Sequence, residues 1–424
     1  MNKNNFSAEG ETAQPLARRD FLRRGTALAG GVAAGAASAS AFAQTAPAAP
    51  WQLTPGTPPT PYGVRSRFEQ AVRYPVRPYP EVAPGAGPTF SPIEALEGTI
   101  TPNDLHFVRT HNGVPDIDPK QHQLLVHGMV DRPLVFSVES LLRYPMTSRV
   151  YFLECSGNSA RNLTPQPLQV PAGALHGLVS CSEWTGIPLR MLLEEAGVKS
   201  GASWLLAEGA DAASMSRSLP LEKAFDDVLV GLYQNGERLR PEQGYPVRLL
   251  VPGWLGNVSV KWLRRLKLVD GPTQTKDETS KYTDPLPDGK ALQFTYEMGV
   301  KSVITRPSST MKLAGQGFHE ISGIAWSGAG RITRVEVSAD GGKTWRDALL
   351  TGQDKPRAVV RFRSAWDWRG GEAILQSRAT DEKGHVQPTR QAWTAIYAPD
   401  IRFHNNSIVS WAVGGDGSVK NVYA

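Results

Sequence analysis

The spacing of hydrophobic and polar residues changes character along the chain. Between residues 102 and 284, short apolar runs alternate with short amphipathic segments, which is typical of mixed α and β structure. Gly197 follows one amphipathic segment as a helix C-cap. The pattern predicts strands at residues 123–128, 150–154, 245–252 and 262–269, and short helices at residues 138–143 and 188–197.

After residue 285 the pattern becomes all-β. Residues 332–338 alternate between apolar and polar side chains, the Asp-Gly-Gly at residues 340–342 predicts a turn, and Thr344 begins a return strand. Further alternation follows at residues 359–362 and 373–379. Short strands at this spacing predict a β-sandwich of roughly 100 residues.

The N-terminus has the order of an export signal. The paired arginines Arg18 and Arg19 precede a mild Gly- and Ala-rich run, and residues 41–43 fit a small-x-small cleavage site. An amphipathic helix is the alternative, but its glycines would weaken it. We expect residues 1–43 to be a twin-arginine signal peptide. Because that route exports folded proteins, it implies a periplasmic destination and a tightly held cofactor.

Residues 44–92 are rich in proline. They hold 12 of the 33 prolines, which excludes a regular helix and disfavours a central strand. Aromatic residues such as Trp51, Tyr62 and Tyr74 are spaced through the segment. We therefore expect an extended arm that docks on the folded body or on a partner.

Composition narrows the classes of function. The 424 residues carry 46 Lys and Arg against 40 Asp and Glu, a formal net charge of +6. Residues 1–43 account for five of the basic and three of the acidic residues, so the mature chain is only mildly basic, at +4. A net charge this small does not indicate a nucleic-acid-binding protein. No later run approaches the roughly 20 apolar residues of a membrane span, so we expect no span in the mature chain.

Two cysteines occur, Cys155 and Cys181. They cannot build a disulfide framework, a four-cysteine zinc site or an iron–sulfur cluster, and no Cys-x-x-Cys-His run exists for covalent haem. Cys155 directly follows an apolar strand and precedes Ser-Gly-Asn, so a turn presents its thiol as a soft metal ligand or a nucleophile. A buried structural thiol is the alternative for Cys155 and the expected state of Cys181.

Two further clusters carry basic residues on irregular segments. Arg109 lies two residues before His111, and its guanidinium suits recognition of an oxyanion or phosphate. Arg248 and Lys261 flank the Pro-Gly-x-x-Gly of residues 252–256, where backbone can approach an anion closely. Neither cluster fits a P-loop or a dinucleotide fingerprint. A surface loop is the alternative for each cluster taken singly.

In their order along residues 95–410, these motifs resemble the sulfite oxidase family of molybdenum enzymes. Arg-x-His-x-x-x-Pro is followed by Glu-Cys-Ser-Gly-Asn, Pro-Val-Arg, Pro-Gly-x-x-Gly and Val-Lys-Trp, and then by the all-β region. The resemblance implies an α+β molybdopterin-binding catalytic domain at residues 93–285. It further implies an immunoglobulin-like sandwich dimerisation domain at residues 286–410 that forms a homodimer, and a C-terminal tail at residues 411–424.

The resemblance also assigns site residues. Cys155 takes the position of the molybdenum ligand, and with Arg109 and Tyr282 it forms the expected catalytic group; a linker aromatic is the alternative for Tyr282. Gln243 stands where a cofactor-binding histidine is common. The implied residues for binding molybdenum–molybdopterin are Phe107, Arg109, His111, Cys155, Asp211, Arg248, Ser259, Val260 and Lys261.

Departures from the family pattern bear on the substrate. Ser407 stands where sulfite oxidases place a late arginine, and Ser-Ala-Arg follows Asn158 where the family often has two arginines. Fewer cations lower the affinity for a free dianion, which favours a larger, less charged sulfur substrate. The chain most resembles the molybdenum subunits of periplasmic sulfane dehydrogenases. This implies sulfane sulfur on a carrier protein as substrate, with a c-type cytochrome partner because the chain has no haem motif.

Three alternatives stay open. The first is a periplasmic sulfite dehydrogenase that acts on free sulfite. The second is a thiol hydrolase with Cys155 as nucleophile and His111 or His176 as base. The third is a secreted binding module built on the β-sandwich, which leaves the mixed α and β half and the export signal unexplained.

Overall fold

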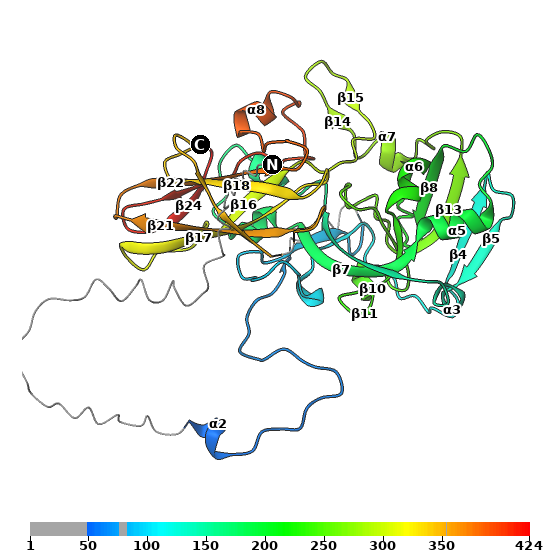
Figure 1. Ribbon diagram of the computed structural model, residues 1–424, viewed down its shortest axis with the longest axis horizontal. Coiled ribbons are helices and arrows are strands. Elements are labelled where there is room, and N and C mark those ends of the chain that lie inside the picture. The colour runs from blue at the N-terminus through cyan, green and yellow to red at the C-terminus, as the bar shows by residue number, and fades with distance from the viewer. Residues whose placement is uncertain (1–48, 76–82, 353) are drawn as a thin grey trace, which may run out of the picture. The chain divides into compact units, whose positions relative to one another are not determined.

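A computed structural model describes residues 49–75, 83–352 and 354–424 (Figure 1). The predicted signal peptide at residues 1–43 lies outside the described residues. The chain divides into two compact units, Met1–Ser66 and Arg67–Ala424. In the first, α2 (Pro50–Leu53) is a short helix, and the second unit holds the other helices and strands of the described residues.

The first half of the larger unit is built mainly from two five-stranded sheets. One has the order β11-β10-β7-β6, with β12 paired to β10, and the other has the order β5-β4-β13-β8-β9. Strands β4 and β13 run parallel, whereas the other pairs are antiparallel. The strands are β4 (Gln123–Gly128), β5 (Leu134–Ser137), β6 (Thr147–Glu154), β7 (Val179–Pro188), β8 (Trp204–Gly209), β9 (Ser216–Pro220), β10 (Leu229–Gln234), β11 (Glu237–Arg238), β12 (Arg248–Leu250) and β13 (Leu263–Val269).

Short helices connect these strands. The described helices of this half are η1 (Asn103–Leu105), α3 (Val138–Leu141), η2 (Ala160–Leu163), α4 (Ala172–His176), α5 (Leu189–Ala196), α6 (Leu221–Asp226), η3 (Pro241–Gln243) and α7 (Lys276–Thr279). Helix α5 buries Leu189, Leu192, Leu193 and Ala196, an apolar stripe with helical spacing. It ends at the predicted cap, Gly197, whose φ is +70°.

The second half consists of two facing sheets, as expected for a sandwich (Figure 1). One sheet has the order β16-β17-β21-β20 and the other β19-β18-β22-β23-β24. The strands are β16 (Lys301–Arg306), β17 (Gly317–Trp326), β18 (Ile332–Ser338), β19 (Arg346–Asp347), β20 (Leu349–Thr351), β21 (Val360–Trp368), β22 (Ala373–Asp381), β23 (Ser410–Val413) and β24 (Val419–Val422), with α8 (Arg390–Thr394) between β22 and β23. The small hairpin of β14 (Asp284–Pro285) and β15 (Ala291–Leu292) precedes it.

The predicted hairpin after β18 forms, with Val337 opposite Arg346. Its turn is held by Asp340, whose carboxylate accepts hydrogen bonds from the backbone N–H of Lys343 (3.0 Å) and Thr344 (2.9 Å). Gly341 has a φ of +74°, a conformation that glycine adopts without a steric penalty. This local chemistry is why the hairpin is visible in the sequence.

A single hydrophobic cluster runs through both halves of the larger unit. The rings of Phe152 on β6 and Trp326 on β17 are both buried, and their centroids lie 6.5 Å apart. The sandwich therefore packs directly behind the strand that leads to Cys155, and the two halves are not independent bodies.

The proline-rich arm differs from its prediction. Residues 87–90 form β2 (Gly87–Phe90), the middle strand between β1 (Tyr74–Pro75) and β3 (Val108–Thr110). The expectation that this segment avoids a central strand was wrong. Pro88 lies opposite Arg109 of β3, and the described residues of β1 lie opposite Thr89 and Phe90.

The expected tail at residues 411–424 is also wrong. Strand β23 pairs with β22, and β24 pairs with β23, so the C-terminus completes a sheet of the sandwich. Trp411 is fully buried and donates its Nε1–H to the carbonyl oxygen of Ile304, at 3.0 Å. The partner strand lies about 40 residues earlier in the sequence, and this long-range pairing has no local signature.

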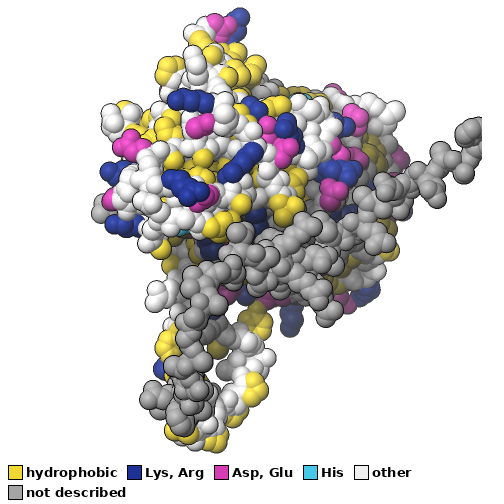
Figure 2. Space-filling view, turned by 60° about the vertical axis from the view of Figure 1, so that its left-hand side comes forward, with side chains coloured by type: hydrophobic (Ala, Val, Ile, Leu, Met, Phe, Trp, Pro, Cys, Tyr) yellow, Lys and Arg dark blue, Asp and Glu magenta, His cyan; other side chains and the backbone are white. Residues whose placement is uncertain are grey.

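Within the described residues, no helix combines the length and the apolar character that crossing a membrane requires. On the face that Figure 2 shows, basic side chains are interspersed with acidic ones. The formal charge is therefore not gathered into one basic stripe on that face.

Replacing Trp411 tests the role of the last two strands. We expect Trp411→Ala to lower the free energy of unfolding by about 3–5 kcal/mol, the usual cost of truncating a buried tryptophan. Ile396→Ala is the control, because Ile396 is 54% exposed and its truncation should change stability by less than about 0.5 kcal/mol. Equal effects of the two substitutions, measured by denaturant unfolding, would contradict the placement of Trp411.

Candidate functional site

The end of strand β6 presents the thiol of Cys155. Its backbone N–H donates to the carbonyl of Leu178 (2.9 Å), and its carbonyl accepts from the N–H of Asn158 (2.8 Å), which closes a turn. Ser159 ends the turn with a φ of +67°, in the left-handed region. Because this backbone is fixed by its own hydrogen bonds, the side chain of Cys155 projects from a defined position.

A glycine of the Pro-Gly-x-x-Gly motif packs against this turn. The N–H of Gly256 donates to the carbonyl oxygen of Glu154 at 2.7 Å. A Cβ at residue 256 would lie 2.8 Å from that same oxygen, closer than real contacts allow. The motif thus serves the close approach of one backbone to another at Cys155, a role that its sequence alone did not reveal.

Cys155 lines a cavity of about 680 Å³, a volume that includes open solvent. Every implied cofactor-binding residue lies on its wall, and so does Tyr282. The lining residues are His106, Phe107, Arg109, His111, Leu153, Cys155, Asp211, Met215, Gln243, Arg248, Gly256, Asn257, Ser259, Val260, Lys261, Trp262 and Tyr282. Residues from β3, β6, β8–β9, β12 and the loop before β13 therefore converge on one place.

Two buried cations, Arg248 and Lys261, lie on the cavity wall. Arg248 is 3% exposed and donates Nη1 to the carbonyl of Gln243 (2.9 Å) and Nη2 to that of Ser259 (3.1 Å). Lys261 donates Nζ to the carbonyl of Glu242, at 2.9 Å. Among the described residues, no carboxylate forms an ion pair with either cation. Burial lowers the pKa of Arg248 to about 9, and burial together with the charge of Arg248 lowers the pKa of Lys261 to about 7.

This arrangement is costly unless an anion enters the cavity. Buried charges are normally paired, and two neighbouring cations repel each other. A phosphate bound between them would offset both costs and return both pKa values toward their ordinary range. The donor set therefore fits the phosphate of a pterin cofactor.

His106 is a cavity residue that the sequence analysis missed. Its Nδ1 donates to the carbonyl of Phe107 (2.9 Å), and its buried Nε2 has no partner among the described residues. Burial lowers the pKa of His106 to about 3, so the ring is neutral and Nε2 is a free acceptor. The Oδ1 of Asn257 is a second buried acceptor without a described partner. Both match a ligand that bears N–H groups, as a pterin does.

Gln243 also belongs to the cavity, although its role was uncertain from the sequence. It is buried, and its Nε2 donates to the carbonyl of Phe107 at 3.0 Å. Its backbone carbonyl accepts from Arg248. Gln243 therefore ties the first basic cluster to the second.

A second, wider cavity meets the first at Cys155. It encloses about 1780 Å³ of space that includes open solvent, and Arg109, His111, Cys155 and Tyr282 line both cavities. The thiol therefore stands between an inner pocket suited to a cofactor and an outer one open to a substrate. The other lining residues are Pro88, Phe90, Ser156, Gly157, Ala160, Arg161, Leu178, Ser280, Lys281, Thr283, Pro285, Asp400, Arg402 and Phe403.

Tyr282 is held between the two cavities. A hydrogen bond of 2.9 Å joins its hydroxyl to Nε2 of His111, and the guanidinium carbon of Arg217 lies 5.4 Å from its ring centroid. Its φ of +51° places a bulky residue in a sparsely populated region, a feature that clusters at functional sites. Burial, reinforced by the nearby Cys155, raises the pKa of Tyr282 above its ordinary value. Burial lowers the pKa of His111 to about 3, so its ring is neutral.

The structure shows which cationic side chains line the outer cavity. Ser407 does not line either cavity; it is buried and donates its Oγ–H to Oδ1 of Asn405, at 2.8 Å. Arg402, which the sequence analysis did not single out, lines the outer cavity together with Arg161 and Lys281. The outer cavity is therefore cationic, although Ser407 does not contribute to it. The register of this irregular stretch could be read only from its tertiary packing.

Two remaining candidates lie elsewhere. Cys181 is buried in the hydrophobic cluster, where burial raises the pKa of its thiol to about 12. His176 is fully buried with Nδ1 bonded to Oγ of Ser159 at 2.7 Å, and it lines neither cavity.

Comparisons with known proteins agree with this site. An oxidoreductase molybdopterin binding domain matches residues 111–276, and a Mo-co oxidoreductase dimerisation domain matches residues 292–410. The crystal structure of the sulfane dehydrogenase SoxCD from Paracoccus pantotrophus superposes with a TM-score of 0.86 and 46% sequence identity. That match covers 89% of this chain and 98% of the other. The chain belongs to the sulfite oxidase family of molybdopterin enzymes.

More distant members of this molybdopterin family are nitrate reductases. Those of Solanum lycopersicum and Arabidopsis thaliana are 32% identical over 343 residues, which is 70% of this chain. The chain spans about 37% of the length of these relatives. Family membership means that this chain is an oxidoreductase whose cofactor is molybdenum–molybdopterin. In the geometry above, Arg248 and Lys261 would hold the phosphate, His106 and Asn257 the pterin ring, and Cys155 the molybdenum.

Lys261 makes the stability of the cofactor-free protein depend on pH. Its folded-state pKa of about 7 lies below the unfolded value of roughly 10.4, so the folded state binds fewer protons between these pH values. The free energy of unfolding of the cofactor-free chain should therefore rise from pH 7 to pH 10, with this residue contributing up to roughly 1.4 kcal/mol per pH unit. Lys261→Met should lack that contribution. Identical slopes in denaturant titrations of the two proteins would contradict the unpaired state of Lys261.

Proposed function

We propose that this molybdopterin oxidoreductase is the molybdenum subunit of a periplasmic sulfane dehydrogenase. One observation carries the proposal: the thiol of Cys155 stands where the cofactor cavity opens into a wide, cationic outer cavity. The 46% identity to the sulfane dehydrogenase SoxCD over nearly the whole of that chain supports the choice of a sulfur substrate.

Each side chain at the junction has a task in this proposal. Cys155 binds the molybdenum, and Arg109 contributes positive charge to both cavities. Tyr282 keeps its hydroxyl proton, and the neutral His111 fixes the direction of that hydroxyl. When bound, the molybdenum cofactor supplies two-electron oxidation with an oxygen atom that comes from water. The protein supplies position and electric field.

The outer cavity supports a substrate with a negatively charged end on a larger body. Arg109, Arg161, Lys281 and Arg402 line it against a single carboxylate, Asp400. Opposite charges draw an anionic group toward Cys155. The width of the cavity leaves room for the chain to which a sulfane sulfur is attached, as on a carrier protein.

Partners and location complete the proposal. The twin-arginine motif at residues 18–24 supports export to the periplasm. A separate c-type cytochrome would remove the electrons, because no haem-attachment motif occurs in the sequence. The dimerisation domain at residues 292–410 supports a homodimer.

A substrate assay decides between this proposal and its main alternative. With the cytochrome as electron acceptor, we expect kcat/KM for a sulfane-loaded carrier to exceed that for free sulfite by at least about tenfold. The cationic lining of the outer cavity also favours free sulfite, so this comparison is needed. Rapid turnover of sulfite alone would replace the proposal by a sulfite dehydrogenase. Nitrate serves as a further test substrate because the relatives include nitrate reductases.

Replacing the ligand tests the role of Cys155. We expect Cys155→Ser to lower kcat by more than about 100-fold, since even the partners of a metal ligand cost 10–100-fold when they are mutated. The fold should persist because the change is local, and Cys181→Ser is the matched control. A metal-free protein that retains activity would favour a thiol hydrolase. Near-native turnover by Cys155→Ser would refute the ligand assignment.

A further inference from the structure

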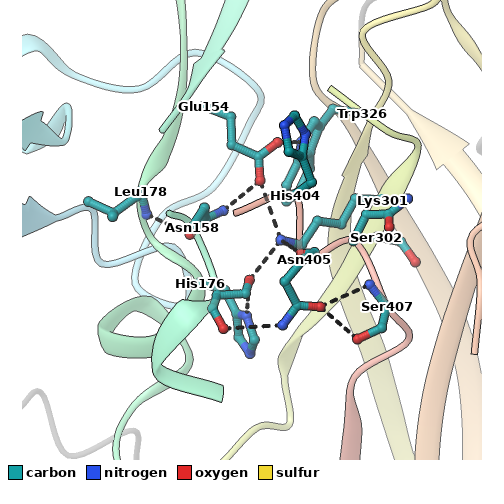
Figure 3. A network of polar contacts seen from close by, with 12 residues as sticks. Glu154, Asn158, His176, Leu178, Lys301, Ser302, Trp326, His404, Asn405 and Ser407 are labelled. Atoms are coloured by element: carbon teal, nitrogen blue, oxygen red, sulfur yellow. Dashed lines mark hydrogen bonds and ion pairs between the residues drawn. The ribbon is translucent and has the colours of Figure 1, made fainter. Parts of the chain in front are cut away.

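A buried polar network lies behind the Cys155 turn, at the boundary between the two halves of the larger unit (Figure 3). At its centre, the ammonium of Lys301 lies 3.3 Å from Oε1 of Glu154, and both side chains are only 1% exposed. Lys301 is the first residue of β16 in the sandwich, whereas Glu154 is the last residue of β6. The pair therefore joins strands that are about 150 residues apart in the sequence.

Every polar hydrogen of the Lys301 ammonium has a partner. Besides Glu154, Nζ donates to Oγ of Ser159 (2.7 Å) and to the carbonyl oxygen of Asn405 (2.6 Å). A lysine ammonium has three donors, so its hydrogen-bonding capacity is filled. Ser159 in turn is the last residue of the Cys155 turn. Lys301 thus contacts the residue before Cys155 and the residue that closes its turn.

The carboxylate of Glu154 is equally well satisfied. Oε1 accepts from Nδ2 of Asn158 (2.9 Å), and Oε2 accepts from Nε1 of Trp326 (2.6 Å). Asn158 also accepts from the N–H of Leu178, at 3.0 Å. In Figure 3, Glu154 and Asn158 on one side face Lys301 and Trp326 on the other. Lys301, Trp326 and the Asn405 carbonyl come from the sandwich half.

The charge balance makes Lys301 the critical member. A carboxylate buried without a cation is strongly disfavoured, and removing one partner of a buried pair costs much more than removing both. Without Lys301, the Glu154 carboxylate would be buried without a cation, directly beside the backbone that leads into Cys155.

We propose that Lys301 is a positioning residue: through Glu154 and Ser159, the sandwich half fixes the turn that holds Cys155 for the metal. The sandwich then has a role in the redox site in addition to dimerisation. The proposal rests on Cys155 as the molybdenum ligand and is independent of which sulfur compound is the substrate.

Amide hydrogen exchange of the cofactor-free protein tests whether Lys301 fixes the turn that holds Cys155. In Lys301→Met we expect exchange of the peptide covering residues 155–162 to be about tenfold faster than in the native protein. Peptides within residues 332–338 and 373–381 of the sandwich should be unchanged. Arg357→Met is the matched control. Arg357 is another cation that joins the two halves, through an ion pair of 2.7 Å with Asp227. Its replacement removes that ion pair and no side-chain contact of the turn. Equal exchange of residues 155–162 in the native and Lys301→Met proteins would overturn the proposal.

A double variant separates positioning from stability. Lys301→Met with Glu154→Gln leaves no charge buried alone, so its Tm should return to within a few degrees of the native value. Its Ser159 and Asn405 still lack the ammonium, so exchange at residues 155–162 should stay raised. If exchange returned to native together with Tm, Lys301 would act only through overall stability, and the proposal would fail.

Spectroscopy of the cofactor-loaded protein tests the link to the metal. We expect Lys301→Met to shift the thiolate-to-molybdenum absorption band and to lower kcat, because the thiol is displaced. The Arg357→Met protein should keep the native band. An unshifted band in a variant whose turn exchanges faster would refute the proposal that Lys301 positions Cys155 for the metal. Loss of the band already in native protein would instead overturn Cys155 as the ligand.

Discussion

The pairing of β6 with β7 is the interaction on which the site depends. Eight residues of β6, Thr147–Glu154, pair antiparallel with β7, and the strand ends where Cys155 begins. Its residues Val150 and Phe152 enter a hydrophobic cluster that both halves of the larger unit share. The strand is therefore held on its face by burial and along its edge by hydrogen bonds. The thiol that follows it has a fixed position between two cavities.

The buried charged residues fall into two groups, those paired within the protein and those without an acidic partner among the described residues. Lys301 and Glu154 are paired, and their polar atoms are satisfied within the protein. Arg248 and Lys261 are buried without an acidic partner among the described residues, and burial lowers the pKa of both. Because an unpaired buried charge is costly in free energy, Arg248 and Lys261 indicate a site for an anionic ligand, whereas Lys301 and Glu154 form a structural ion pair. The degree of burial alone does not distinguish these two groups of residues.

The sequence predicted the local elements and motifs well where the chemistry is local. The hairpin around the Asp-Gly-Gly turn, helix α5 with its Gly197 cap and the Cys155 turn all form as expected. The predictions failed where pairing is distant in the sequence. Strand β23 pairs with β22, and Pro88 lies in a middle strand, because the positions of their partners are decided by the assembled sheets.

The sequence by itself determined which residue types are available: one thiol after an apolar strand, basic residues on irregular segments and the ordered motifs of a molybdopterin enzyme. Only the tertiary structure decided which of them meet. It brought Arg402 rather than Ser407 to the outer cavity, added His106 to the inner one and joined Lys301 to Glu154. The physical reason is that motifs are set by neighbours along the chain, whereas cavities and buried charge pairs are set by packing between strands far apart in the sequence.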